Sequence, residues 1–235
     1  MILDESRKIF ISEVMRYLKV SIMKVSDFIE KLIPGETVVI EHDAKTSPVT
    51  LFYSILGQGR KQNSTVLIDD FMDTLYLYKA HLELSGFDTS LINNSQVIKI
   101  GGIRDVGNVV EKIPLSPGPP LKEQYRMAYN RVVSSHQTVL NLCLGIEKFF
   151  VLSDSRIEIL SEVADISLYV GDTSRIAIYF INRDILKEVS PSPLPFLEAL
   201  ATTLGELKHE NKHYVIAITK SANLEIEGKK IEVKF

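Results

Sequence analysis

The hydrophobic pattern at the start of the chain predicts two helices. Between residues 2 and 33, apolar side chains recur every three or four positions, as they do on one face of a helix. The positions that carry this pattern are Ile9, Val14, Leu18, Ile22, Phe28, Ile29 and Leu32. Ser26 stands where it would cap the second helix, and Pro34 and Gly35 end it. We therefore expect an N-terminal helical segment over residues 1–33.

After this segment, apolar strands alternate with short amphipathic helices. Residues 37–40 are a continuous apolar run suited to the centre of a parallel sheet, and 64–71 and 96–100 are predicted as the second and third strands. Helical spacing follows the first two runs, at 49–56 and 73–85. This alternation is typical of βαβ units, in which the strands form a parallel sheet.

The second half of the chain continues this rhythm after an interruption. Residues 101–120 contain Gly and Pro clusters, which favour an irregular surface connection. The pattern then predicts, in order, a helix over 121–145, a fourth strand at 149–152, a helix over 157–170, a fifth strand at 175–181, a helix over 196–207, and an antiparallel hairpin of 214–218 with 229–235. We expect a single α/β domain over residues 1–235, with residues 34–235 as its core.

Composition and charge narrow the functional classes. Of the 235 residues, 45% are hydrophobic, which is enough to bury a sizeable core. The net charge of −3 argues against binding nucleic acid through bulk electrostatics. The single cysteine, Cys143, falls in the predicted helix 121–145, where we expect a buried, inert thiol. The charged start is unlike a signal peptide and no run approaches the ~20 apolar residues of a membrane span. We expect a cytoplasmic protein.

The connection between the first strand and its helix stands where a phosphate-binding loop would be. A buried strand, a tight loop and an apolar helix are the setting of the motif G-x-x-x-x-G-K-[ST]. Counted from the strand, the two glycines fall on His42 and Ser47, the lysine on Pro48 and the hydroxyl residue on Val49. We call these eight positions the degenerate loop: His42, Asp43, Ala44, Lys45, Thr46, Ser47, Pro48 and Val49.

The substitutions in the degenerate loop remove what phosphate binding needs. Glycine allows positive φ and close approach of the backbone, which His42 and Ser47 allow less readily. Pro48 has neither a charge nor an amide donor, and Val49 has no oxygen for Mg²⁺. Lys45 is the only cation in the loop, three residues before the position of the motif's lysine. His42 has two interpretations: it fills the space of the phosphate, or it serves as a general base or ligand sensor.

The order of the elements resembles the RecA/KaiC-like branch of P-loop ATPases. Residues 33–36 (I-P-G-E) are similar to the turn before its first strand, and 39–43 (V-I-E-H-D) to its hhEGD motif, with His in place of Gly. Residues 65–70 stand where the branch has its second strand and catalytic Glu, and 84–88 (L-S-G-F-D) are similar to its LGFD helix exit. The resemblance is strongest to an uncharacterised archaeal family with a degenerate P-loop. It implies a RecA-like three-layer αβα fold with a mostly parallel central sheet, an N-terminal helix and a C-terminal antiparallel hairpin.

The resemblance also implies positions for catalytic carboxylates. The family's catalytic Glu corresponds to Asp69 or Asp70, and the choice between them stays open. Its Mg²⁺-holding Asp corresponds to Ser153, with Asp154 one residue later. Asp69, Asp70 and Asp154 therefore form a candidate acidic cluster near the carboxyl ends of the strands. They are either ligands for Mg²⁺ or Mn²⁺, or helix caps and loop acids, an interpretation that Asp73 fits as an N-cap.

These observations favour a protein that keeps an ATPase fold and has lost ATP binding and hydrolysis. We assign no catalytic residue, metal or cofactor, and the replaced loop positions favour a non-enzyme. RecA-like domains associate by taking up a neighbour's extended segment, so we expect a protein or peptide partner, with a homo-oligomer as one form of it. Nucleic acid and membrane are not expected partners. The alternative is a metal-assisted hydrolase, or a nucleotide-binding regulator, that uses the Asp cluster.

Overall fold

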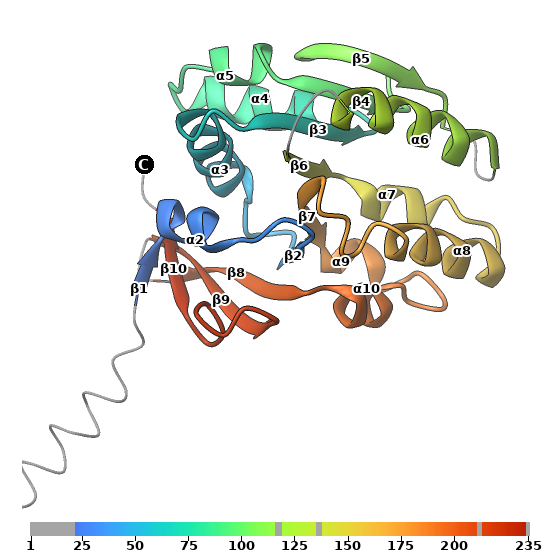
Figure 1. Ribbon diagram of the computed structural model, residues 1–235. Helices are drawn as coiled ribbons and strands as arrows, with labels where there is room; N and C mark the ends of the chain where they lie inside the picture. Colours follow the sequence, from blue (N-terminus) through green and yellow to red (C-terminus); the bar gives the residue numbers. More distant parts are fainter. Residues whose placement is uncertain (1–21, 116–118, 135–137, 211–212, 234–235) are drawn as a thin grey trace, which may run out of the picture.

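Helices lie against both faces of one continuous ten-stranded sheet (Figure 1). The computed structural model describes residues 22–115, 119–134, 138–210 and 213–233. The strand order across the sheet is β1-β10-β9-β8-β2-β7-β6-β3-β4-β5. The elements in chain order are β1 (Ile22–Lys24), α2 (Val25–Lys31), β2 (Thr37–His42), α3 (Val49–Lys61), β3 (Thr65–Phe71), α4 (Thr74–Leu84), α5 (Ser90–Asn93), β4 (Gln96–Ile100), β5 (Asn108–Ile113), α6 (Pro119–Val133), β6 (Val139–Leu144), α7 (Ile146–Val151), α8 (Arg156–Ser167), β7 (Arg175–Asn182), α9 (Arg183–Leu186), α10 (Leu194–Leu200), β8 (Thr203–Glu210), β9 (His213–Ser221) and β10 (Lys230–Val233).

The centre of the sheet is parallel and one side of it is antiparallel. The strands from β8 through β2, β7, β6, β3 and β4 to β5 all pair in parallel. β9 runs antiparallel to both β8 and β10, and β1 adds to β10 in parallel. Every residue of β2 and β6 is buried, as expected for strands that are covered on both faces. The predicted parallel sheet with a C-terminal antiparallel hairpin is confirmed.

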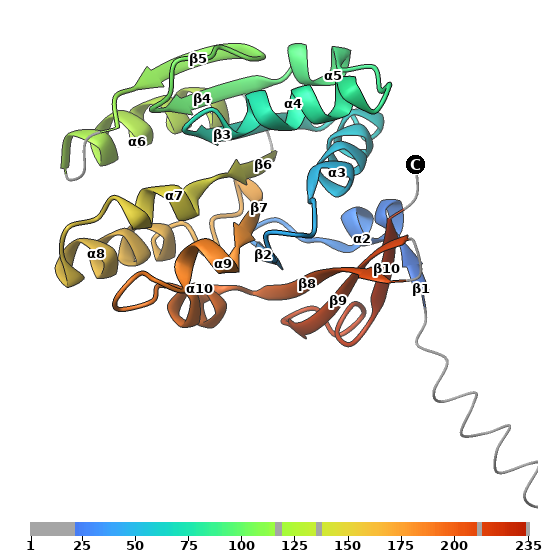
Figure 2. The same cartoon turned by 180° about the vertical axis from the view of Figure 1, so that it is seen from behind.

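Successive side chains of the strands point to opposite faces of the sheet and pack into two separate hydrophobic cores. Val38 and Ile40 of β2 pack with residues of α2, α3, α4 and α5. Val39, between them, packs on the other face with residues of α6, α7, α8 and α10. The two views in Figures 1 and 2 show these helix groups on opposite sides of the sheet. The predicted three-layer arrangement is confirmed, and it places the degenerate loop and the later helices on different faces.

The second helix predicted in the N-terminal segment is present as α2, but its start and its cap differ from the prediction. Residues 1–21, which carry most of the predicted helical segment, lie outside the described residues. Ile22 begins a strand rather than continuing a helix, because β1 pairs in parallel with β10. Ser26 does not cap the following helix, which starts at Val25 with Lys24 as its N-cap residue. The Ser26 hydroxyl instead donates to Asp27.

The prediction for residues 121–152 is wrong in its boundaries. The helix ends at Val133, and Val139–Leu144 form a central strand, β6, so Cys143 is a buried strand residue. The predicted strand 149–152 is mostly the helix α7. A short, continuously apolar run has no periodicity that separates a buried strand from a buried helix, which is why the pattern failed here. Gly145, at φ 80°, makes the turn between the two elements.

Two further strands were not predicted. β5 lies within the stretch 101–120 that the sequence indicates as irregular, at the edge of the sheet beside β4. β8 occupies the second half of the predicted helix 196–207, and α10 ends at Leu200. In β8, buried and half-buried residues alternate from Thr203 to Leu207, which is a strand period.

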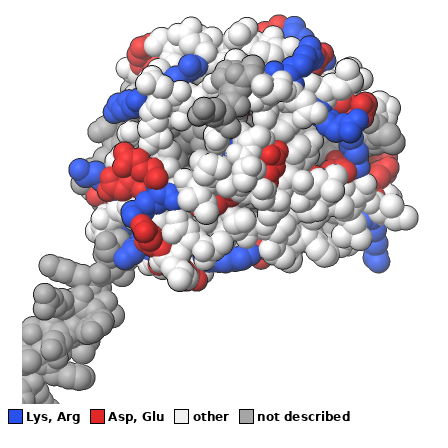
Figure 3. Space-filling view, in the orientation of Figure 1, with Lys and Arg blue, Asp and Glu red and all other residues white. Residues whose placement is uncertain are grey.

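The described surface carries charges of both signs. On the face drawn in Figure 3, Lys and Arg side chains are interspersed with Asp and Glu, and much of the face is uncharged. Among the described residues, none of the helices has the length and apolar content needed to cross a lipid bilayer.

Candidate functional site

The degenerate loop connects the end of β2 to the start of α3. It lies at the carboxyl ends of the parallel strands, where ligands bind in open α/β sheets. His42, at its start, is only 6% exposed, and Nδ1 of its ring lies 2.9 Å from the carbonyl oxygen of Asp43. Burial lowers the pKa of His42. A buried, neutral ring that is already hydrogen-bonded agrees with a space-filling residue better than with a general base.

Two carboxylates accept hydrogen bonds from backbone amides of the degenerate loop. The Ala44 amide donates to Asp184 Oδ2 at 2.8 Å, and the Lys45 amide donates to Asp43 Oδ1 at 3.0 Å. The Thr46 amide donates to the Asp43 carbonyl at 3.2 Å. In a phosphate-binding loop, amides of this kind point at the phosphate oxygens. Here the chain's own negative charges take that place, and they would repel a triphosphate.

At the start of α3, Pro48 and Val49 occupy the positions of the motif's lysine and hydroxyl residue. Pro48 is the N-cap residue and makes no side-chain cap, and Val49 is 6% exposed. The Ser47 hydroxyl lies 3.5 Å from the Val49 amide. Lys45, the only cation of the loop, is exposed to solvent.

Two ionisable residues next to the loop, Glu41 and Arg183, bear on whether an anion could bind there. Burial and the neighbouring Glu198 raise the pKa of Glu41, the residue before His42, to about 7. The nearest guanidinium, that of Arg183, donates to Glu206 at 2.6 Å. The arginine is thus already paired, and this edge of the sheet does not attract an anion.

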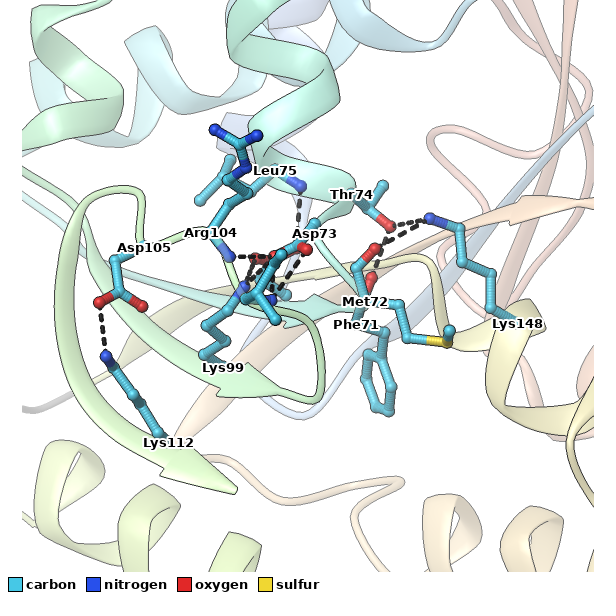
Figure 4. A network of polar contacts seen from close by, with 12 residues as sticks. Phe71, Met72, Asp73, Thr74, Leu75, Lys99, Arg104, Asp105, Lys112 and Lys148 are labelled. Atoms are coloured by element: carbon cyan, nitrogen blue, oxygen red, sulfur yellow. Dashed lines mark hydrogen bonds and ion pairs between the residues drawn. The ribbon is translucent and has the colours of Figure 1, made fainter. Parts of the chain in front are cut away.

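Asp69 and Asp70 lie on opposite faces of the sheet, because successive residues of a strand point in opposite directions. Asp70 Oδ1 accepts from the Leu75 amide at 2.8 Å, and Asp70 Oδ2 lies 3.2 Å from Lys99 Nζ. Lys99 Nζ also lies 2.5 Å from Asp73 Oδ1 (Figure 4). The carboxylates of Asp70 and Asp73 are therefore already paired with a buried lysine ammonium.

Asp73 is the N-cap residue of α4, as the sequence indicates, but it does not cap the helix with its side chain. Its backbone is left-handed, at φ 61°, and its side chain makes no cap bond to α4. The carboxylate instead accepts from the amides of Ile103 at 2.9 Å and Arg104 at 2.8 Å (Figure 4). Asp73 thus fastens the connection after β4 to the connection after β3.

Asp69 belongs to a buried chain of polar contacts on the other face. Its Oδ2 accepts from Asn141 Nδ2 and from the Tyr125 hydroxyl, both at 2.8 Å. Asn141 Oδ1 in turn accepts from Arg175 Nη1 at 2.8 Å. Burial raises the pKa of Asp69 to about 6, although the hydrogen bonds from Asn141 and Tyr125 oppose this shift. We call these four residues the Asp69–Arg175 network.

Asp154 does not join the other two carboxylates. Because β6 is the strand that follows α6, Ser153 and Asp154 come after α7 and not after a strand. The Asp154 amide donates to Glu158 Oε2 at 2.8 Å, and Ser155 Oγ accepts from the Glu158 amide at 3.2 Å. This is a helix cap of α8. Within the described ranges, no three His, Cys, Asp or Glu side chains are grouped so that they could hold a metal.

The end of β6 carries a carboxyl group that the sequence pattern missed. Glu147, the second residue of α7, is 5% exposed, and its Oε2 has no hydrogen-bond partner among the described residues. Burial raises its pKa to about 7. A Cβ on Gly145 would collide with the Thr74 hydroxyl, to which Lys148 Nζ donates at 2.8 Å (Figure 4). In the sequence, Gly145 directly after the apolar run 139–144 was the one indication that β6 ends there.

Comparison with known proteins supports the fold and leaves the activity open. Residues 27–232 match the family described as "Pyrococcus protein of unknown function, DUF257". A solved structure from Pyrococcus horikoshii OT3, titled a structural study of project PH0250, is 32% identical, with a TM-score of 0.76 over 88% of this chain and 97% of that chain. No curated protein matches the sequence.

Two more distantly related solved structures are also similar to this chain. The KaiC-like protein PH0186 from Pyrococcus horikoshii OT3 is 11% identical, with a TM-score of 0.55 over 85% of each chain. The flagellar accessory protein FlaH from Methanocaldococcus jannaschii is 15% identical, with a TM-score of 0.46 over 84% of this chain and 83% of that chain. The similarity to the KaiC-like protein shows a shared fold, as the sequence resemblance implies.

Proposed function

We propose that this chain, which belongs to the Pyrococcus family of unknown function DUF257, is a non-catalytic interaction module that does not bind ATP and that binds a segment of another protein. The observation that carries the first part is the satisfaction of the Ala44 and Lys45 amides by the carboxylates of Asp184 and Asp43. The donors that would hold a phosphate are engaged by fixed negative charges, and Pro48 and Val49 stand where the motif has its lysine and its hydroxyl residue.

The second part is supported by an exposed apolar surface on α8. The apolar stripe of α8 consists of Ile157, Leu160, Ala164 and the C-cap residue Leu168, which recur at helical spacing on its solvent side. Ile157 is 80% exposed, Leu160 43% and Leu168 78%. A contiguous apolar stripe on an outer helix is typical of a surface that a protein partner covers. It lies on the face of the sheet opposite to α3, so it does not depend on a working phosphate loop.

The first expected result is the absence of ATP binding. Titration of the purified chain with ATP and Mg²⁺ in a calorimeter should show no saturable heat, which corresponds to a Kd weaker than about 1 mM. Phosphate release should not exceed that of a Pro48→Ala variant. The variant Asp43→Asn/Asp184→Asn lacks the two carboxylates that repel ATP, and its titration with ATP is compared with that of the unaltered chain. Saturable binding of ATP by the unaltered chain would contradict the proposal.

The second expected result concerns the apolar stripe of α8. Immobilised chain should retain specific proteins from an extract of the organism that encodes it, and the variant Leu160→Asp/Leu168→Asp should retain at least about tenfold less of them. The variant Leu84→Asp is the control, because Leu84 is 87% exposed on α4, away from the stripe. Quantitative mass spectrometry of the eluates measures the difference. Equal retention by the stripe variant would disprove the role of this surface.

A further inference from the structure

A cavity of about 350 Å³ lies between α6 and α8 on the face of the sheet opposite to α3. Its walls are apolar and aromatic, and its mouth opens between exposed residues of the two helices, Arg126 on one side and Leu168 on the other. An engineered apolar cavity of ~150 Å³ is known to hold benzene. The space here is more than twice as large, within the range of small-molecule sites. It is large enough for a compound with two fused rings.

The floor of the cavity carries one unsatisfied acceptor. Asp69 lines the cavity and is 2% exposed. Its Oδ2 is engaged by Asn141 and Tyr125, whereas its Oδ1 has no hydrogen-bond partner in the described part of the chain. A buried acceptor without a partner costs free energy. A ligand that brings an N–H or O–H group to this atom removes that cost.

The charged groups around the cavity are already paired with one another, which disfavours a charged ligand. The Asp69 carboxylate is connected through Asn141 to the Arg175 guanidinium. At the mouth, Lys122 forms ion pairs with Glu162 and Asp165. A cation or an anion in the cavity would lack a counterion and would lose its hydration. An uncharged molecule suffers neither penalty.

We propose that this cavity binds a small uncharged molecule with a ring-bearing apolar body and one O–H or N–H group, which donates to Asp69 Oδ1. Phe149 and Tyr179 are among the aromatic residues that line the space for the rings. Phenols and indoles are the simplest members of this class. The site is independent of the degenerate loop, which lies on the other face of the sheet, and it shares one residue, Leu168, with the apolar stripe of α8.

The test compares two probes that differ only in the donor. 2-Naphthol carries the hydroxyl group, and 2-methoxynaphthalene carries the same ring with the hydrogen replaced by a methyl group. We expect saturable binding of 2-naphthol at pH 7, followed by its fluorescence, and an affinity about tenfold to hundredfold lower for the methyl ether, as for the loss of one hydrogen bond to a charged group. No saturable binding of 2-naphthol, or equal affinities for the two probes, would overturn the proposal.

Variants locate the site. Ile166, which lines the cavity from α8, is replaced by the larger phenylalanine, and Ile166→Phe should abolish binding of 2-naphthol. Ile103→Phe is the matched control, because Ile103 is 87% exposed and does not line the cavity. Asp69→Asn places an amide nitrogen at one of the two oxygen positions and should bring the affinity ratio of the two probes close to one. If Asp69→Asn does not fold, Ile166→Phe decides alone, and unchanged binding by that variant refutes the assignment.

Discussion

Replacing Arg175 with methionine should cost about 3–5 kcal/mol of the free energy of unfolding at pH 7.5, the loss typical of a buried charge whose partner is removed. Arg175 is 1% exposed, and it balances the Asp69 carboxylate through Asn141. Its guanidinium carbon also lies 4.9 Å from the centre of the Tyr169 ring. Methionine fills similar space but leaves Asp69 as an uncompensated buried charge. Denaturant unfolding at constant pH measures the loss.

Two controls separate this electrostatic effect from a packing effect. Arg131→Met removes an arginine that is 63% exposed and paired with Glu111, and should cost less than about 1 kcal/mol. Asp69→Asn added to Arg175→Met removes the stranded charge and should restore at least about half of the loss. A double variant that is no more stable than Arg175→Met would contradict the electrostatic explanation.

The electrostatic explanation also predicts how the stability loss of Arg175→Met changes with pH. Burial raises the pKa of Asp69 in the folded chain to about 6, above its ordinary value of 3.8. A raised carboxyl pKa means that the folded state holds the proton more tightly, so stability decreases as pH rises from about 4 through 6. Loss of the Arg175 cation raises this pKa further. The deficit of Arg175→Met should therefore be largest at pH 7 to 8 and smaller at pH 5, where Asp69 is protonated.

The sequence predicts the parallel part of the sheet because some of its strands are followed by recognisable helices. β2 and β3 are apolar runs, and each is followed by a helix with clear spacing, which only a βαβ arrangement satisfies. The degenerate loop was predicted for the same reason, since it is the connection between β2 and α3. Its chemistry could be read from the residue types alone: Pro48 has no amide donor and Val49 has no oxygen.

The residues at the end of the fourth strand could not be predicted correctly, because the sequence does not show where this strand begins and ends. β6 is apolar at five of its six positions, and it follows α6 without a strong break in pattern. Placing this strand at 149–152 moved the expected metal ligand to Ser153 and Asp154, which in fact lie at the cap of α8. The correct boundary leads to Glu147 instead. The pairing of Asn141 with Asp69 depends on the same strand, so the Asp69–Arg175 network was equally hidden.

The second large loss of stability that we expect follows from replacing Lys99. Lys99→Met should destabilise the chain by about 3–5 kcal/mol at pH 7.5, because it leaves two carboxylates near each other without a cation. Lys99 is 3% exposed, Asp70 is 1% exposed, and the ammonium lies 3.2 Å from Asp70 and 2.5 Å from Asp73. Lys112→Met is the matched control, since Lys112 is 63% exposed and paired with an exposed Asp105, and it should cost less than about 1 kcal/mol.

The consequence of losing Lys99 should reach beyond the ion pair, because Asp73 also holds the amides of Ile103 and Arg104. Repulsion between Asp70 and Asp73 acts against those bonds, so amide hydrogen exchange at residues 103 and 104 should become faster in Lys99→Met. The variant Lys99→Met/Asp70→Asn removes the repulsion and keeps the bonds of Asp73, and it should restore slow exchange together with much of the stability. Unchanged exchange in Lys99→Met would show that Asp73 holds this connection without help from the lysine, and that the lysine acts through Asp70 alone.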